Sequence, residues 1–158
     1  MTFGPAGFSA ILATMGTVEV DRNGLEVLDR EQCLSLLAGA SLGRVGVTTG
    51  ALPTVLPVNF VLHDDRILIR SGEGTKLDAA LRDAVVAFEV DDFDPLYHSG
   101  WSVVVTGVAT SLDDPEELAA VDRLALPHWA PQPDGHVVAI STEMVSGRRL
   151  DRGRLGSD

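Results

Sequence analysis

The chain has 158 residues, a length that fits one domain of ordinary size. Its 23 acidic residues outnumber its 12 basic residues, and a net charge of −11 repels both nucleic acid and anionic membrane surfaces. The single cysteine, Cys33, excludes an intrachain disulfide and a metal site built from cysteines, which fits a reducing compartment. We therefore expect a cytoplasmic protein whose partners are small molecules rather than nucleic acid or a membrane.

The N-terminal stretch has no basic residue before Arg22, unlike the start of a signal peptide, and its longest apolar run is too short to cross a bilayer. Residues 1–25 are rich in Gly, Ala and Thr without a regular period, which predicts a mobile arm. Residues 26–152 form the single expected domain, and residues 153–158 form a flexible tail.

The first predicted helix begins at Asp29. Asp29 and Gln32 have the spacing of a capping box, and Gly39 ends the helix. Cys33 lies on the apolar face of this helix, where packing in the core is favoured over a role as a reactive thiol. Apolar residues then alternate along two predicted strands that flank the turn at 48–50.

The remaining elements are mostly strands. In chain order they are a strand at 66–71, a short helix at 76–82, strands at 84–90 and 101–110, a helix at 114–124, a proline-rich crossing loop at 127–133, and strands at 136–141 and 145–150. Six or seven strands with three short helices indicate a mostly β, antiparallel barrel rather than an alternating parallel sheet.

The segment from Arg70 to Lys76 is the best candidate for a binding site. Gly72 and Gly74 allow close approach of the backbone, and a helix begins at Thr75 and Lys76. Helix-start N–H groups, a hydroxyl, an ammonium and a nearby guanidinium together suit a phosphate. The spacing matches neither a Walker loop nor a Rossmann fingerprint, and taken alone it fits a tight turn with a capping threonine. Lys76 is, however, the only lysine of an acidic chain.

Five short motifs follow one another in a recognisable order: Leu56-Pro57-Val58-Asn59-Phe60, Ile67-Leu68-Ile69-Arg70-Ser71, Gly74-Thr75-Lys76, the stretch 100–107 and Gly147-Arg148-Arg149. Over about residues 28–150 the chain resembles the pyridoxamine-phosphate-oxidase-like, FMN-binding split-barrel superfamily. Within it the chain is most similar to the small actinobacterial and nitroimidazole-resistance-type branch. The resemblance implies a six- to seven-stranded antiparallel split β-barrel with short peripheral helices, bound FMN and a homodimer.

The resemblance also implies roles for nine residues. The backbone of Ile69, Arg70 and Ser71 would lie along the flavin, and Thr75 and Lys76 would hold its phosphate. Val58 and Asn59 would flank the isoalloxazine ring. Trp101 and Ser102 would approach the flavin of the partner subunit, although Trp101 is equally well explained by packing at the dimer interface.

Two features separate the chain from the true oxidase. The oxidase places a Ser-Arg-Lys triplet at the phosphate, whereas Thr75 is followed directly by Lys76, so one base is missing. The oxidase's C-terminal arginine-and-histidine substrate signature is also missing. His128 and Trp129 in the proline-rich loop are candidates for the rim of a substrate site, with a plain surface histidine as the simpler interpretation of His128. The histidines lack the spacing of a zinc site, so no metal is expected.

The predicted function is that of an FMN-dependent oxidoreductase, for example a reductase of small nitro or quinone compounds. Flavin chemistry needs few protein acids or bases, so the catalytic residues stay unassigned. No arrangement typical of a serine hydrolase occurs. Two alternatives stay open: a cofactor-binding or storage protein without turnover, and the same barrel holding a deazaflavin or haem.

Overall fold

The structure is a computed structural model that describes residues 18–124, 126 and 135–150. The three helices of this part are α1 (Arg30–Ala38), α2 (Lys76–Leu81) and α3 (Pro115–Arg123). The strands are β1 (Glu26–Leu28), β2 (Leu42–Thr49), β3 (Leu52–Asn59), β4 (Val61–His63), β5 (Arg66–Gly72), β6 (Val85–Asp94), β7 (Ser99–Ser111), β8 (Gly135–Ser141) and β9 (Met144–Leu150). None of the described helices is long and apolar enough to span a membrane.

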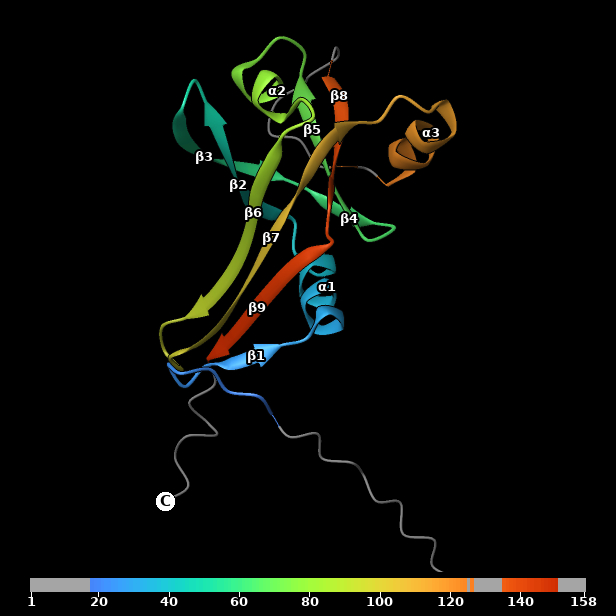
Figure 1. Cartoon of the computed structure of the whole chain (residues 1–158). Helices are drawn as coiled ribbons and strands as arrows, with labels where there is room; N and C mark the ends of the chain where they lie inside the picture. Colours follow the sequence, from blue (N-terminus) through green and yellow to red (C-terminus); the bar gives the residue numbers. More distant parts are fainter. Residues whose placement is uncertain (1–17, 125, 127–134, 151–158) are drawn as a thin grey trace, which may run out of the picture.

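Strand β7 holds the sheet together, because it pairs with three other strands. One edge of β7 pairs with β6 along most of its length. The opposite edge is divided: residues 100–106 pair with β9, and residues 109–111 pair with β8. From β6 the sheet continues to β2 and β3, and from β8 it continues to β5 and β4. Figure 1 shows the consequence, a long sheet of β6, β7 and β9 and a second arm of β8, β5 and β4 that diverges from it. This is the expected antiparallel split barrel.

Gly107 lies where the edge of β7 changes from β9 to β8. A Cβ atom at Gly107 would lie 2.0 Å from the carbonyl oxygen of Ser141, the last residue of β8. The Ser141 hydroxyl also accepts a hydrogen bond from the N–H of Val108 at 3.1 Å. The end of β8 can therefore rest on β7 only because residue 107 has no side chain.

The helix starts follow the predicted capping rules. The Asp29 carboxylate accepts from the N–H of Gln32 at 2.8 Å, and the Gln32 amide oxygen accepts from the N–H of Asp29 at 2.9 Å, which confirms the capping box. Thr75 and Asp114 cap α2 and α3 in a similar way. Cys33 is fully buried on α1, which confirms it as a core residue, and burial raises the pKa of its thiol.

Two hydrophobic cores flank β5. The main core fills the barrel, with Phe60 and Phe88 packed edge to face at a centroid distance of 4.9 Å. A smaller core lies between α3 and the other face of β5, where Leu68 meets Val121 and Val137. Burial on both faces explains why residues 67–69 read as a continuous apolar run.

The number of strands differs from the six or seven expected. Nine occur among the described residues, because β1 and β4 are three-residue strands and the second strand predicted after the turn at 48–50 is interrupted before Val61. The interruption is Phe60, whose ring is fully buried and whose N–H donates to the carbonyl of Ser41 instead of joining the ladder. Residues 18–25 fold back on the domain through a bridge between Val20 and Glu26. Of the mobile arm predicted at residues 1–25, residues 1–17 lie outside the described residues, and so does the predicted tail at 153–158.

Gly107→Ala should lower the free energy of unfolding by about 1–3 kcal/mol, because the added methyl group meets backbone that cannot move aside easily. Gly46→Ala on β2 is the matched control, since its Cβ atom would meet the Cβ of Ala87 at an ordinary 3.5 Å. Denaturant unfolding of both variants measures the difference, and equal midpoints would contradict the role assigned to Gly107.

Candidate functional site

The candidate site begins at the end of β5, where one edge of the strand is unpaired. β8 pairs with β5 from Arg66 to Gly72, but β4 pairs with the other edge only as far as Leu68. From Ile69 to Ser71 no described strand pairs with the edge that faces away from β8. Peptide groups on such an edge are available to a ligand.

The side chains of these three residues point to alternate faces. Ile69 and Ser71 are buried on the face that lines the barrel. Arg70 points to the other face, where its guanidinium pairs with Asp122 of α3 at 2.9 Å. Arg70 therefore offers only its backbone to the candidate site. Its guanidinium, which was expected near the phosphate, is instead paired with Asp122.

The start of α2 uses several of its own polar groups. The Thr75 hydroxyl donates to the carbonyl of Gly72 at 2.9 Å and accepts from the N–H of Asp78 at 3.1 Å. The Asp78 carboxylate accepts from the N–H of Gly74 at 3.0 Å. Thr75 is thus a helix cap first, as the simpler interpretation of the sequence had it. The Lys76 side chain is exposed and makes no ion pair with the described residues, so it is the positively charged group that the start of α2 offers to a ligand.

Ser71 contributes an unusual group at the same place. Its hydroxyl is the buried side-chain polar atom that lacks a hydrogen-bond partner among the described residues. Leaving such a group unpaired costs about 1–3 kcal/mol. The end of β5 therefore carries an unused donor on the face against which α2 packs.

Val58 and Asn59 lie at the end of β3, which contacts β5 without pairing with it. Val58 is buried in the main core, and Asn59 is half-buried where the chain bends into β4. The structure therefore brings the strand of these predicted residues into contact with β5, whose edge is open beyond Leu68.

Trp101 and Ser102 lie far from this site in the fold. They lie near the start of β7, at the lower end of the long sheet in Figure 1, whereas α2 lies at the upper end. Trp101 points inward and packs on the main core, and it lines a hollow of about 300 Å³ with Arg149 and Asp92. Ser102 alternates with it and shares the outer face with Val104. One chain does not bring these two residues to Lys76.

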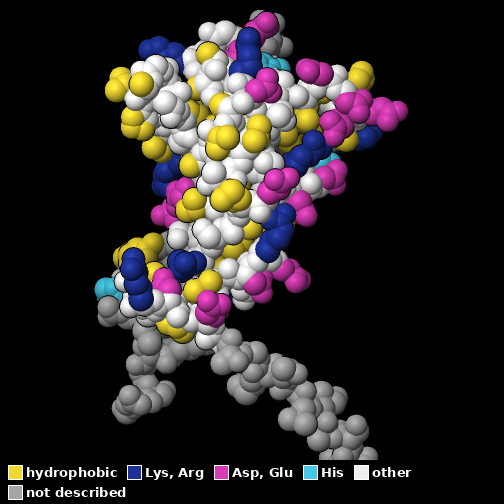
Figure 2. Space-filling model, in the orientation of Figure 1, with side chains coloured by type: hydrophobic (Ala, Val, Ile, Leu, Met, Phe, Trp, Pro, Cys, Tyr) yellow, Lys and Arg dark blue, Asp and Glu magenta, His cyan; other side chains and the backbone are white. Residues whose placement is uncertain are grey.

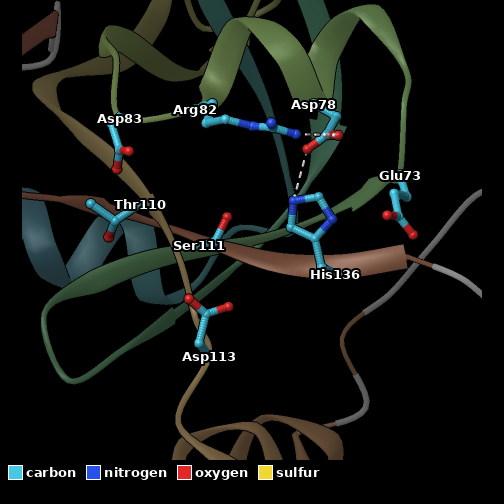
Figure 3. A pocket seen from close by; sticks show the side chains of 8 residues that line it. All are labelled: Glu73, Asp78, Arg82, Asp83, Thr110, Ser111, Asp113 and His136. Atoms are coloured by element: carbon cyan, nitrogen blue, oxygen red, sulfur yellow. Dashed lines mark hydrogen bonds and ion pairs between the residues drawn. The ribbon is translucent and has the colours of Figure 1, made fainter.

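A polar cavity beside α2 was not predicted. The carboxylate of Asp78 is only 3% exposed, and its Oδ1 atom lies 2.8 Å from Nε2 of His136 on β8. Figure 3 shows this pair with Arg82 at the wall of a cavity of about 460 Å³. Further carboxylates, those of Glu73, Asp83 and Asp113, line the same cavity. No sequence motif connects Asp78 with His136, because only the register of β5 and β8 brings His136 under α2.

Two predicted residues cannot be placed, since His128 and Trp129 lie outside the described residues. Among residues 18–124, 126 and 135–150, no group of three His, Cys, Asp or Glu side chains could hold a metal ion.

The split barrel and its open strand edge define the class of protein, and comparison with known families agrees. The family model described as pyridoxamine 5'-phosphate oxidase matches residues 29–149. The chain therefore belongs to the pyridoxamine 5'-phosphate oxidase family. The order of motifs had suggested this membership, and it is confirmed.

Three of the similar proteins come from actinobacteria. The uncharacterized protein Rv0080 of Mycobacterium tuberculosis is 44% identical over 128 residues, which span 78% of this chain and 84% of that protein. A structure called the FAD binding protein from Mycobacterium smegmatis is 36% identical with a TM-score of 0.70, covering 78% of this chain and 98% of that one. A Corynebacterium diphtheriae protein of unknown function is 34% identical with a TM-score of 0.66, over 80% and 98% of the two chains.

Proposed function

We propose that this protein binds FMN at the end of β5 and the start of α2, and that it acts as a homodimeric oxidoreductase on small molecules. The observation that carries the proposal is the position of Lys76. In a chain of net charge −11, the single lysine is exposed and unpaired among the described residues, next to a strand edge that no described strand covers. The dianionic phosphate of FMN needs such a local positive charge.

The residues present fit a flavin phosphate and ring. Lys76 would hold the phosphate, and the backbone from Ile69 to Ser71 would offer peptide groups to the ring system. The unpaired hydroxyl of Ser71 gives this strand a donor that no described group uses. Val58 and Asn59 would flank the ring from β3. When bound, the flavin supplies the electron and hydride transfer, so the protein has to bind it, orient it and limit its contact with water.

The names of the relatives support a flavin as the cofactor, but they do not single out FMN. The Mycobacterium smegmatis protein is called FAD binding. FAD contains the FMN group, so a site for the phosphate next to the flavin would serve both cofactors. We favour FMN because the resemblance of the motifs points to an FMN-binding superfamily.

An absorbance spectrum of the freshly purified protein, repeated after addition of FMN and desalting, tests the proposal. Retention of about one flavin per chain is expected, and mass analysis of the released cofactor distinguishes FMN from FAD. A deazaflavin spectrum, a haem Soret band or a colourless protein that retains no FMN would contradict it. Reduction of the bound flavin by NADH or NADPH, followed by reoxidation by a nitro or quinone compound, separates an enzyme from a storage protein.

Lys76→Ala should weaken FMN binding by about 1.5–3 kcal/mol, the usual contribution of a charged hydrogen bond. Arg66→Gln is the charge-matched control on the same strand, because Arg66 pairs with Glu117 of α3 at 2.7 Å and faces away from the site. Titration of the flavin-free variants with FMN, followed by flavin fluorescence, gives the two affinities. Equal affinities of Lys76→Ala and the wild type would remove Lys76 from the site.

The proposed homodimer rests on an apolar sheet face. Alternation puts Val55, Val85, Val104, Val108 and Met144 on the outer face of the long sheet, and these side chains are 40–70% exposed. Figure 2 shows hydrophobic side chains gathered over β6 and β7. A second copy placed on this face would cover them. Ser102 shares the face, so a dimer could bring Ser102 of one subunit toward the flavin of the other.

Val108→Asp should convert the dimer to a monomer, because it would bury a charge at the centre of this face. Val20→Asp, which changes an exposed valine outside this face, is the control. Light scattering measures the molar mass of both variants against the chain mass of 16.7 kDa. A wild-type protein that is monomeric at micromolar concentration would contradict the proposed dimer.

A further inference from the structure

The buried carboxylate of Asp78 ties three parts of the molecule together. Its Oδ2 atom accepts from the N–H of Gly74 in the loop before α2, and its Oδ1 atom lies 2.8 Å from Nε2 of His136 on β8. Arg82 follows the last residue of α2, and its guanidinium lies 3.4 Å from Oδ2 of Asp78. The loop that presents Lys76, the helix that follows it and strand β8 therefore meet at one side chain (Figure 3).

A carboxylate that is only 3% exposed needs compensating partners, because water no longer solvates its charge. Of its two side-chain partners, Arg82 is 71% exposed and makes the longer contact, so solvent screens it. His136 is 30% exposed and makes the shorter contact. His136 is therefore the principal partner of Asp78.

The surroundings make this pairing more important. Besides Asp78, the cavity is lined by the carboxylates of Glu73, Asp83 and Asp113, and its other lining side chains, Thr110 and Ser111, are neutral. Without His136, Asp78 would face three carboxylates with only the exposed Arg82 to offset them. The same negative charge would then act on any phosphate held at Lys76, two residues before Asp78.

We infer that His136 is a positioning residue: by pairing with Asp78 it fixes the loop from Gly72 to Thr75, so that Lys76 is presented in one conformation and Asp78 does not repel a bound phosphate. The consequence for the phosphate rests on the proposed function. The effect on the loop does not, because it exists in the flavin-free protein and can be measured there.

The single lysine gives a direct measurement. An endoproteinase specific for lysine can cut this chain only after Lys76. In the flavin-free, full-length protein under native conditions, His136→Phe should be cut about tenfold faster than the wild type, the change expected when a charged hydrogen bond that holds the loop is lost. His136→Gln keeps an amide donor for Asp78 and should restore most of the slow cutting.

Two controls isolate the loop. His63→Phe removes a histidine of nearly equal exposure, 31%, whose partner Asp64 is an exposed turn residue, and it should leave the cutting rate unchanged. Gly107→Ala lowers global stability without touching the loop. If Gly107→Ala accelerated cutting as much as His136→Phe does, the cut would follow global unfolding, and the inference would be overturned.

Asp78→Asn keeps the inference testable if His136→Phe does not fold. The amide oxygen that this substitution introduces can still accept from the N–H of Gly74, but the charge that His136 compensates is gone. Replacing His136 by Ala, which offers no donor, should therefore change the cutting rate less in the Asp78→Asn background than in the wild-type background. Equal changes in both backgrounds would mean that the two residues do not act together.

FMN binding is measured second, and its outcome separates a failure of the proposed function from a failure of the inference about His136. His136→Phe should weaken FMN binding about tenfold, with partial recovery in His136→Gln. If the wild type binds no flavin, the proposed function is wrong and the cutting rates alone decide the inference. If flavin binds but His136→Phe is cut as slowly as the wild type, the inference about His136 is wrong and the proposed function stands.

Discussion

The divided edge of β7 is the constraint from which the geometry of this protein follows. A strand edge can pair with only one neighbour at each residue, so β9 takes residues 100–106 and β8 takes residues 109–111. The chain passes from β8 to β9 within a few residues, and this tight passage requires the bare backbone of Gly107. Because β8 leaves the long sheet there, β5 and β4 leave with it, and the sheet does not close back onto β3. The open edge of β5 lies where the closure is missing.

Electrostatics complement this geometry. An acidic chain disperses well but repels phosphate groups, so an anion site needs a local reversal of charge. At the start of α2 the ammonium of Lys76 is exposed, and the buried carboxylate of Asp78 is held by His136 and Arg82. The arginines Arg66 and Arg70 on the neighbouring strand are both held by carboxylates of α3 and add little to the field at the site. The polarity of the site is therefore set by a few residues that meet from α2 and β8.

Local rules predicted the local features. The capping box at Asp29, the caps of α2 and α3 and the burial of Cys33 depend on residues within one helical turn, and all were predictable from the sequence. The break at Phe60 and the ion pair between Arg70 and Asp122 depend on packing between distant segments, which spacing does not reveal. The pairing of Asp78 with His136 is of the same kind. The opposite orientations of Trp101 and Ser102, by contrast, follow from the two-residue period of a strand and could have been expected.

The scarcity of lysine also bears on how this protein can be handled. Reagents that couple proteins to beads, sensor surfaces or dyes commonly attack amines, and arginine guanidinium groups do not react with them. Apart from the terminal amine, Lys76 is the single amine of the chain. Coupling at alkaline pH would therefore attach part of any preparation through the start of α2 and cover the proposed cofactor site. Coupling near neutral pH favours a terminal amine, whose ordinary pKa is about 8 against about 10 for lysine, and so leaves Lys76 and the start of α2 unmodified.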